Sequence, residues 1–261
     1  MSEYAKAYQA ATGKMAPHNL DTLFDQIKAG TLLPPRGQQA VDAGLTAHAL
    51  TDPRVAPAVY HYYDWVVNHY LQQPVNELSA KLIGMALTAA NVFATNLPQP
   101  LTINPWQVPE LMNWPLATER AVVIENNGVF IWLHHLHPTW PLIDQGGNDF
   151  QPAYVTLLNA MVAQGLHLAY LGDLDATGIR IADTLVHAVP AKDWLAIQTP
   201  QQVSNWLIFH GKTDPQRTKL QAVRDPQLKE EMRSVAVTFR QFVEQEQLIP
   251  DYERLIQNWL G

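Results

Sequence analysis

The sequence predicts an all-α N-terminal region, residues 1–108, followed by an α/β domain with a mostly parallel sheet and a helical C-terminal tail, residues 109–261. In the first region apolar residues recur at helical spacing. In the second, short buried-strand patterns alternate with helical ones, an order typical of parallel sheets with right-handed crossovers. Two of those strand patterns end in acidic residues, at Glu125 and at Asp173 with Asp175.

The N-terminal helices are expected where apolar periodicity is bounded by proline. Leu33-Pro-Pro, Asp52-Pro and Gln73-Pro are natural helix boundaries, because the residue before a proline avoids helical backbone angles. The stretch from 97 to 115 is rich in Pro and Trp and is expected to cross between the two regions. The predicted helices cover residues 20–29, 36–50, 56–72 and 75–94.

The α/β domain is expected to begin with a strand from Arg120 to Glu125. A helix over 129–137 follows and stops at Pro138. A short strand and a Gly146-Gly147 turn occupy 140–147, and the third strand pattern starts at Leu166. The remaining predicted elements are helices at 150–164, 179–189, 216–240 and 251–260 and a last core strand at 194–199.

Asp173 and Asp175 are the most informative residues of the chain. They end an apolar strand pattern one residue apart, so both carboxylates emerge on the same face of the strand. Ligand sites in open α/β sheets lie at the carboxyl ends of strands. Two carboxylates this close repel each other unless a cation lies between them. Oxygen ligands without cysteine favour Mg²⁺ or Mn²⁺.

Several interpretations of the Asp-x-Asp-x-x-Gly string compete. A calcium loop is excluded because Thr184 stands where that loop needs a bidentate Glu. A haloacid-dehalogenase-like phosphatase would use Asp173 as nucleophile, and Thr177 also fits that pattern. A structural interpretation makes Asp175 a helix N-cap and Asp173 a turn residue. A further interpretation adds Glu125, which the alternating order brings to the same edge of the sheet.

With Glu125 included, the pattern resembles the Toprim domain of topoisomerases, primases and nucleases, which has a Rossmann-like sheet. Glu125-Asn126, the glycine turn and Tyr170–Ala182 are similar to the Toprim (JetD-type) subunit of Wadjet plasmid-defence systems. More distantly they resemble the cleaving subunit of type IIB topoisomerases. Segments 76–87, 101–106 and 244–250 also resemble the defence family. The likeness covers roughly residues 75–250.

The resemblance implies Mg²⁺-dependent (or Mn²⁺-dependent) DNA cleavage by a Toprim nuclease within an anti-plasmid complex. Asp173 and Asp175 would hold the metal, and Glu125 would complete its shell or act as general acid/base. Glu246 is the candidate that the family suggests for a second ion. The implied partners are DNA and an SMC-like motor complex, with a homodimer also conceivable. The other two functions considered are the phosphatase and a non-catalytic Toprim-like scaffold that binds nucleic acid or a partner.

The charge balance shapes the DNA hypothesis. The formal net charge is −7, whereas a free-standing DNA binder usually has a basic surface. From Gly211 to Arg240, however, seven basic residues oppose four acidic ones. This stretch either lines a DNA backbone track or forms a solvated helix with ion pairs. DNA binding by the chain alone is expected to be weak, with the DNA presented by a partner. The candidate DNA-binding residues are Lys212, Arg217, Lys219 and Arg224.

Composition narrows the remaining classes. The chain has no cysteine, which excludes disulfides and thiolate metal sites. It has no apolar run of membrane-spanning length and no secretory signal pattern, so a cytoplasmic protein without membrane contact is expected. His134 and His137 lack a third ligand at a recognisable spacing, which disfavours zinc. The nucleophile is expected to be water, because the tyrosines between 60 and 70 match a packing pattern.

Overall fold

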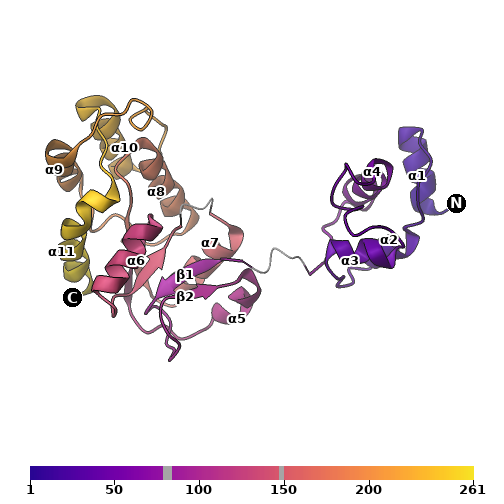
Figure 1. Ribbon diagram of the computed structural model, residues 1–261, viewed down its shortest axis with the longest axis horizontal. Helices are drawn as coiled ribbons and strands as arrows, with labels where there is room; N and C mark the ends of the chain where they lie inside the picture. The colour runs from indigo at the N-terminus through magenta and orange to yellow at the C-terminus, as the bar shows by residue number, and fades with distance from the viewer. Residues whose placement is uncertain (79–83, 147–149) are drawn as a thin grey trace. The chain divides into compact units, whose positions relative to one another are not determined.

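The computed structural model describes residues 1–78, 84–146 and 150–261. The chain forms two compact units, Met1–Leu82 and Ile83–Gly261. The first unit is helical, and the second contains a five-stranded sheet with helices (Figure 1). The expected class, an α/β domain with a mixed, partly parallel sheet preceded by a helical region, is therefore confirmed.

The first unit packs four helices around an aromatic core. Tyr8 and Phe24 each lie against the ring of Tyr62, with ring centroids 4.9 and 5.4 Å apart. Tyr62 and Tyr63 are buried, which confirms the expected packing role for these two tyrosines, whereas Tyr60 is partly buried and Tyr70 is exposed. A helix that the sequence did not predict, α1, opens the unit with Ser2 as its N-cap. The helices are α1 (Glu3–Thr12), α2 (Asp21–Lys28), α3 (Arg36–Asp42) and α4 (Pro57–Trp65), the last continued by a π-helical turn (Val66–Leu71).

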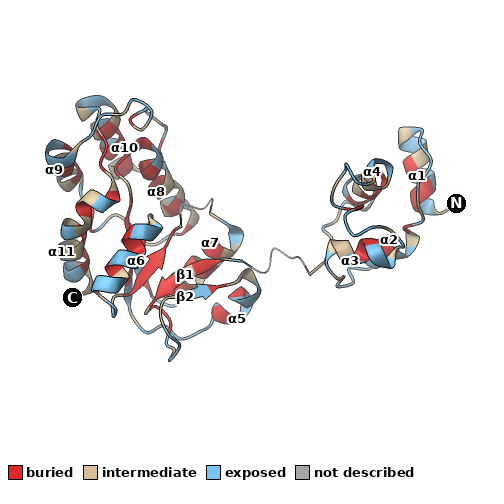
Figure 2. Ribbon diagram, viewed as in Figure 1, coloured by how far each residue is buried: buried red, intermediate tan, exposed pale blue. Residues whose placement is uncertain are grey.

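The sheet of the second unit has the strand order β2-β1-β4-β3-β5. The interior strands β4 and β3 and the edge strand β5 run parallel to one another. Strand β1 pairs antiparallel with both β4 and β2. Figure 2 shows the strands mostly buried, except for β2, where only Ile103 is buried. The strands are β1 (Leu87–Ala90), β2 (Leu101–Ile103), β3 (Arg120–Ile124), β4 (Leu142–Asp144) and β5 (His167–Leu171).

The parallel strands are connected by helices, as expected. From β3 the chain passes through α6 to β4 on one side, then through α7 to β5 on the other side of β3. Right-handed crossovers in opposite directions place α6 and α7 on opposite faces of the sheet. The helices are α5 (Val108–Leu111), α6 (Asn127–Leu136), α7 (Pro152–Ala163), α8 (Ala176–Ala188), α9 (Pro200–His210), α10 (Pro226–Arg233) and α11 (Ile249–Leu260). The shorter turns are Pro105–Gln107, Ser234–Phe239 and Gln245–Leu248.

Several expected elements were wrong. The described part of the predicted helix 75–94 contains β1, because Leu87 to Ala90 find strand partners on two sides. Together with β2 it adds sheet structure within residues 1–108, the region expected to be all helical. The expected core strand 194–199 is a turn: Tyr170 N–H donates to Trp194 O at 2.9 Å, but no ladder forms. The expected helix 216–240 is helical only from Pro226, where Asp225 caps α10. Among the described residues, no helix is long and apolar enough to cross a membrane.

Candidate functional site

Glu125 follows β3 directly and lies at the carboxyl edge of the parallel strands. Its backbone N–H donates to Leu171 O at 3.1 Å, so the pairing of β3 with β5 continues into this residue. Its Oε2 atom accepts hydrogen bonds from Tyr170 Oη at 2.7 Å and from Asp173 N at 3.1 Å. Burial raises the pKa of Glu125 to about 7 and the Asp173 charge adds to this, although the two hydrogen bonds act in the opposite direction.

In both Asp173 and Asp175, one carboxylate oxygen accepts hydrogen bonds from backbone N–H groups and the other contacts the guanidinium of Arg217. Asp173 Oδ1 accepts from Gln245 N at 2.9 Å, and Asp175 Oδ1 accepts from Thr177 N and Gly178 N as the N-cap of α8. The Oδ2 atoms both face the Arg217 guanidinium. Burial and the neighbouring Asp175 raise the pKa of Asp173, against the hydrogen bond from Gln245 and the Arg217 charge.

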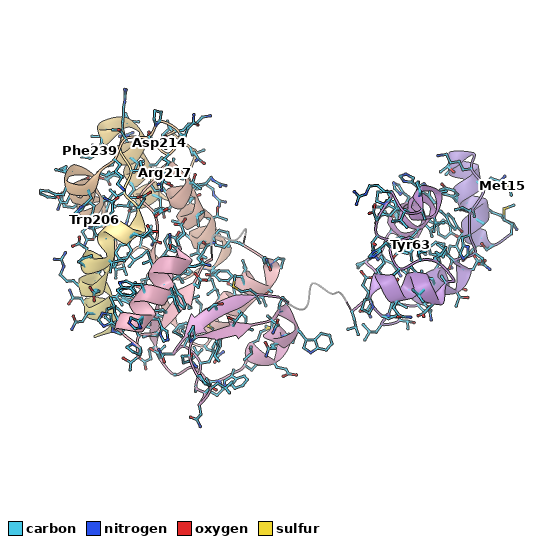
Figure 3. The ribbon with its side chains drawn as sticks, in the orientation of Figure 1. Met15, Tyr63, Trp206, Asp214, Arg217 and Phe239 are labelled. Atoms are coloured by element: carbon cyan, nitrogen blue, oxygen red, sulfur yellow. The ribbon has the colours of Figure 1, made fainter. Side chains whose placement is uncertain are left out.

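Arg217 is the cation that the aspartate pair requires. Its Nε lies 2.8 Å from Asp175 Oδ2, Nη2 lies 3.2 Å from Asp173 Oδ2, and Nη1 lies 2.8 Å from Glu244 Oε1. The guanidinium stacks on Phe242 at 4.0 Å from the ring centroid. Figure 3 labels Arg217 on the segment between α9 and α10. The side chain is 26% exposed, so it belongs to the site rather than to the open surface.

The segment 242–248 closes the site from the C-terminal side. Gln245 is fully buried; its Nε2 donates to Leu171 O at 2.8 Å and its Oε1 accepts from Asn126 N at 2.8 Å. Glu246 accepts from Asn126 Nδ2 at 2.9 Å, which places this expected second-ion residue beside the Glu125 turn. Val243 makes a two-way backbone pair with Leu174, between the two aspartates. The ends of β3 and β5 are therefore joined by residues about seventy to one hundred and twenty positions away in the chain.

The candidate DNA-binding residues separate into different environments. Lys212 lies 2.7 Å from Glu244, so it joins the same charged cluster as Arg217. Arg224 faces Asp183 of α8 at 3.5 Å, and its backbone N–H also bonds that carboxylate. Lys219 is exposed and makes no ion pair within the described residues. The predicted four do not form a single group.

Asp144 is an acidic strand end that sequence reasoning did not select. It ends β4 opposite Ile124 of β3, so its side chain points to the face of the sheet opposite to that of Glu125. Its Oδ1 accepts from Gly146 N at 3.1 Å, and burial raises its pKa to about 6. The signal in the sequence was an acidic residue at a strand end followed by a glycine, in Ile143-Asp144-Gln145-Gly146. The pairing of Asp144 with Ile124 nevertheless keeps its side chain away from Glu125 and the aspartate pair. Gly147 of the expected turn lies outside the described residues.

A second buried carboxyl lies apart from this cluster, on α10. Glu231 is completely buried and accepts from Gln198 Nε2 at 3.0 Å and from Gln227 Nε2 at 3.1 Å. Burial raises its pKa from 4.5 to about 7, against those two hydrogen bonds. Gln198 Oε1 is buried without a hydrogen-bond partner among the described residues.

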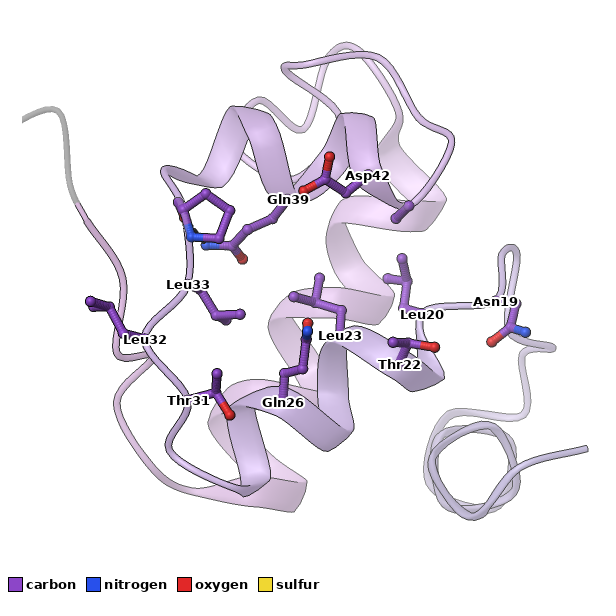
Figure 4. A pocket seen from close by; sticks show the side chains of 12 residues that line it. Asn19, Leu20, Thr22, Leu23, Gln26, Thr31, Leu32, Leu33, Gln39 and Asp42 are labelled. Atoms are coloured by element: carbon purple, nitrogen blue, oxygen red, sulfur yellow. Dashed lines mark hydrogen bonds between the residues drawn. The ribbon is translucent and has the colours of Figure 1, made fainter.

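A hollow of about 430 Å³ lies in the first unit, between α2 and α3 (Figure 4). Leu20, Leu23 and Leu33 contribute apolar walls, and Gln39 lines the pocket with its buried Oε1 unpaired among the described residues. Asp42 is the acidic residue of this lining. One carboxylate among amides and leucines does not make an acid/base or metal site, so the carboxylate cluster of the second unit is the candidate site.

The donor chemistry of the cluster matches a hard cation, but the cluster is closed around an arginine. Within residues 1–78, 84–146 and 150–261, no three Asp, Glu or His side chains are poised together to hold a metal ion. The Oδ2 atoms of Asp173 and Asp175 nevertheless already share one cation, Arg217. Two oxygen donors of this type fit Mg²⁺ or Mn²⁺ once the guanidinium gives way.

Fold and site together define an α/β protein with an acidic cluster at the carboxyl edge of its parallel strands. Residues 101–256 match the family described as protein of unknown function C-terminus (DUF2399), and this match covers more than half of the chain. The chain belongs to that family. None of the curated proteins matches it. The matched region includes every residue of the carboxylate cluster.

Proposed function

We propose that the protein cleaves DNA phosphodiester bonds with Mg²⁺ or Mn²⁺, as a Toprim-type nuclease. One observation carries the proposal: the strand-end Glu125 and the Asp173-x-Asp175 pair meet at one edge of a parallel sheet, with Asp173 N–H donating to Glu125 Oε2 at 3.1 Å. The order strand-Glu, helix, strand, helix, strand-Asp-x-Asp is the one implied by the resemblance to the Toprim subunits of Wadjet systems.

The residues divide the work according to their environments. Asp173 and Asp175 would hold the ion through the oxygens that Arg217 now contacts. A bound Mg²⁺ would neutralise the charge that develops on the phosphodiester and orient its oxygens. Glu125, with a pKa of about 7, takes up or gives a proton near neutral pH, which suits a general acid/base. Tyr62 and Tyr63 are buried in packing, which favours water as the nucleophile.

Charge supports a partner-dependent reaction. The chain carries a formal charge of −7, and Lys212, Arg217 and Arg224 are all engaged with carboxylates. DNA therefore meets little uncompensated positive charge near the site, and a partner that presents the DNA would compensate for this. The resemblance implies an SMC-like motor complex in that role, with a homodimer as the second form. Glu246 beside Asn126 is the proposed ligand for a second ion.

A second candidate function, a non-catalytic scaffold for a partner or a nucleic-acid end, is favoured by one observation. Every carboxylate oxygen of the aspartate pair already contacts Arg217 or a backbone N–H group. A phosphatase that uses Asp173 as nucleophile receives less support, since Glu125 has no role in that reaction.

The test is metal-dependent nicking of supercoiled plasmid by the purified protein, with Asp173→Asn and Asp175→Asn in parallel. Asparagine keeps an oxygen for the backbone N–H groups that each aspartate now binds, so the variants are expected to fold while losing the charge that a metal needs. Glu230→Gln, on the exposed side of α10, is the matched control for loss of one carboxylate. Cleavage that requires metal, survives in the control and is lost in both Asn variants supports the nuclease.

Glu125→Gln separates the alternatives. If the protein is a Toprim-type nuclease, this variant should lose DNA cleavage. If Asp173 is instead a phosphatase nucleophile, the variant should hydrolyse p-nitrophenyl phosphate nearly as well as the wild type. Binding of Mn²⁺ to the wild type that disappears in Asp173→Asn, without any cutting, would point to a partner-dependent nuclease. A protein that neither cuts nor binds Mn²⁺ contradicts the proposal and leaves the scaffold.

A further inference from the structure

Each carboxylate oxygen of Asp173 and Asp175 already accepts at least one hydrogen bond. Backbone N–H groups of Gln245, Thr177 and Gly178 take the Oδ1 atoms, at 2.7 to 2.9 Å. The Oδ2 atom of each aspartate contacts a different nitrogen of the Arg217 guanidinium. The backbone contacts position the carboxylates, and the remaining oxygen of each one faces a cation. A divalent ion bound by Asp173 and Asp175 would therefore need the same two Oδ2 atoms that the Arg217 guanidinium now contacts.

Arg217 is held in place by contacts that do not depend on the aspartates. Its ring partner Phe242 and its ion pair with Glu244 at 2.8 Å lie on the segment before the 245–248 turn. Its backbone O accepts from Ala176 N at 2.9 Å. Nη1 contacts Glu244 whereas Nε and Nη2 contact the aspartates, so the ion pair with Glu244 does not use the nitrogens that face Asp173 and Asp175.

We propose that Arg217 is a built-in counter-cation that competes with the divalent ion for Asp173 and Asp175. In the metal-free protein it neutralises the pair and preserves their spacing. When the ion binds, the guanidinium leaves the two Oδ2 atoms and stays on Glu244 and Phe242. This inference rests on the proposed metal-dependent function, and it makes Arg217 a positioning residue that sets how tightly the site binds metal.

Calorimetric titration with MnCl₂ tests the competition directly. Arg217→Gln removes the guanidinium, and Lys212→Gln is the matched control: it removes the same charge from a residue that contacts Glu244 but neither aspartate. Because two cations that compete for one site weaken each other reciprocally, Arg217→Gln is expected to bind Mn²⁺ about tenfold more tightly than the wild type. Lys212→Gln should stay within about threefold, since an exposed pair is worth little.

Thermal unfolding gives a second readout that does not involve catalysis. In EDTA, Arg217→Gln should melt below the wild type, because Asp173, Asp175 and Glu244 lose their shared counter-charge. Saturating Mn²⁺ should raise the melting temperature of this variant by more than it raises that of the wild type or of Lys212→Gln. Adding Asp173→Asn to Arg217→Gln should remove both the tighter binding and the extra stabilisation.

The outcomes distinguish this inference from the proposed function. If the wild type binds Mn²⁺ and Arg217→Gln binds no more tightly than Lys212→Gln, the counter-cation role is overturned while the metal site stands. If none of the proteins binds Mn²⁺, both proposals fall. Should Arg217→Gln not fold, Arg217→Lys replaces it, because an ammonium cannot span three carboxylates. It should also bind Mn²⁺ more tightly than the wild type, and equal or weaker binding overturns the inference.

Discussion

Replacing Glu231 with Gln tests how a fully buried carboxyl group with only amide side-chain partners limits stability. The pKa of Glu231 rises from 4.5 to about 7 in the folded protein because burial disfavours its charge. Below about pH 4.5 both folded and unfolded chains hold the proton. As the pH rises towards 7 the unfolded chain releases it first, so the free energy of unfolding falls, and above about pH 7 this loss is complete.

The magnitude follows from the two pKa values. At about 1.4 kcal/mol per pKa unit, raising the pKa from 4.5 to about 7 corresponds to a loss of about 3 kcal/mol in the free energy of unfolding at high pH. Most of that loss falls between pH 5 and pH 8. Glutamine cannot ionise, and its amide can donate to the unpaired Gln198 Oε1 after the Gln198 amide rotates. Between pH 5 and pH 8, the free energy of unfolding of Glu231→Gln should therefore fall by about 2 to 3 kcal/mol less than that of the wild type.

Urea unfolding of both proteins at pH 5 and pH 8 measures the difference. Other titrating groups, such as Glu125 and Asp144, contribute equally to wild type and variant and cancel in the comparison. Glu230→Gln, exposed on the same helix, should follow the wild type within about 0.5 kcal/mol at both pH values. Equal pH dependence of the wild type and Glu231→Gln would refute the reasoning, since it would mean that Glu231 ionises without cost in the folded state.

Three further predictions concern the site and its support. Tyr170→Phe removes the 2.7 Å hydrogen bond to Glu125, so the pKa of Glu125 should rise above about 7; a carboxyl ¹³C titration that shows no increase contradicts the geometry. Asp175→Ala should cost about 1 kcal/mol more than Asp175→Asn in chemical unfolding, because Asn keeps the cap of α8, and equal costs would exclude the cap. Gly178→Ala should cost about 2 to 3 kcal/mol, since its Cβ would overlap the Asp173 backbone, and a melting temperature unchanged from the wild type would show that the turn relaxes freely.

Local patterns predicted the parallel half of the sheet. The runs ending at Glu125 and Asp173 are apolar and mostly buried, the first rich in β-branched residues and the second in leucine, and the structure forms strands there. The helical spacing of apolar residues over 75–94 predicts a helix at Leu87–Ala90, but pairing with β2 and β4 overrides that local pattern. The run 194–199 is apolar because it is packed in the core, not because it pairs as a strand.

The carboxylates of the site could be predicted, whereas the contacts between them could not. Strand ends in a parallel sheet must share an edge, which is enough to bring Glu125 and the aspartates together. The cation between the aspartates was expected to be a metal, and the structure has Arg217 there, forty-two residues beyond Asp175. Gln245 lies in segment 244–250, which resembles the defence family, but it was not predicted to join the strand ends, because an uncharged side chain that binds backbone atoms gives no charge or spacing signal. Both contacts depend on how the irregular segments after α8 fold back.

The position of Gln245 has a consequence for biosynthesis. This residue bonds Leu171 and Asn126 and supplies the N–H that orients Asp173, yet it is made more than seventy residues after Asp173. A ribosome-bound chain that has exposed only the sheet and α8 therefore holds the acidic residues without the groups that align them. If the protein cuts DNA, the site becomes competent only after the segment beyond residue 240 has emerged and docked. An unfinished chain would carry the three acidic residues in a site that still lacks Gln245.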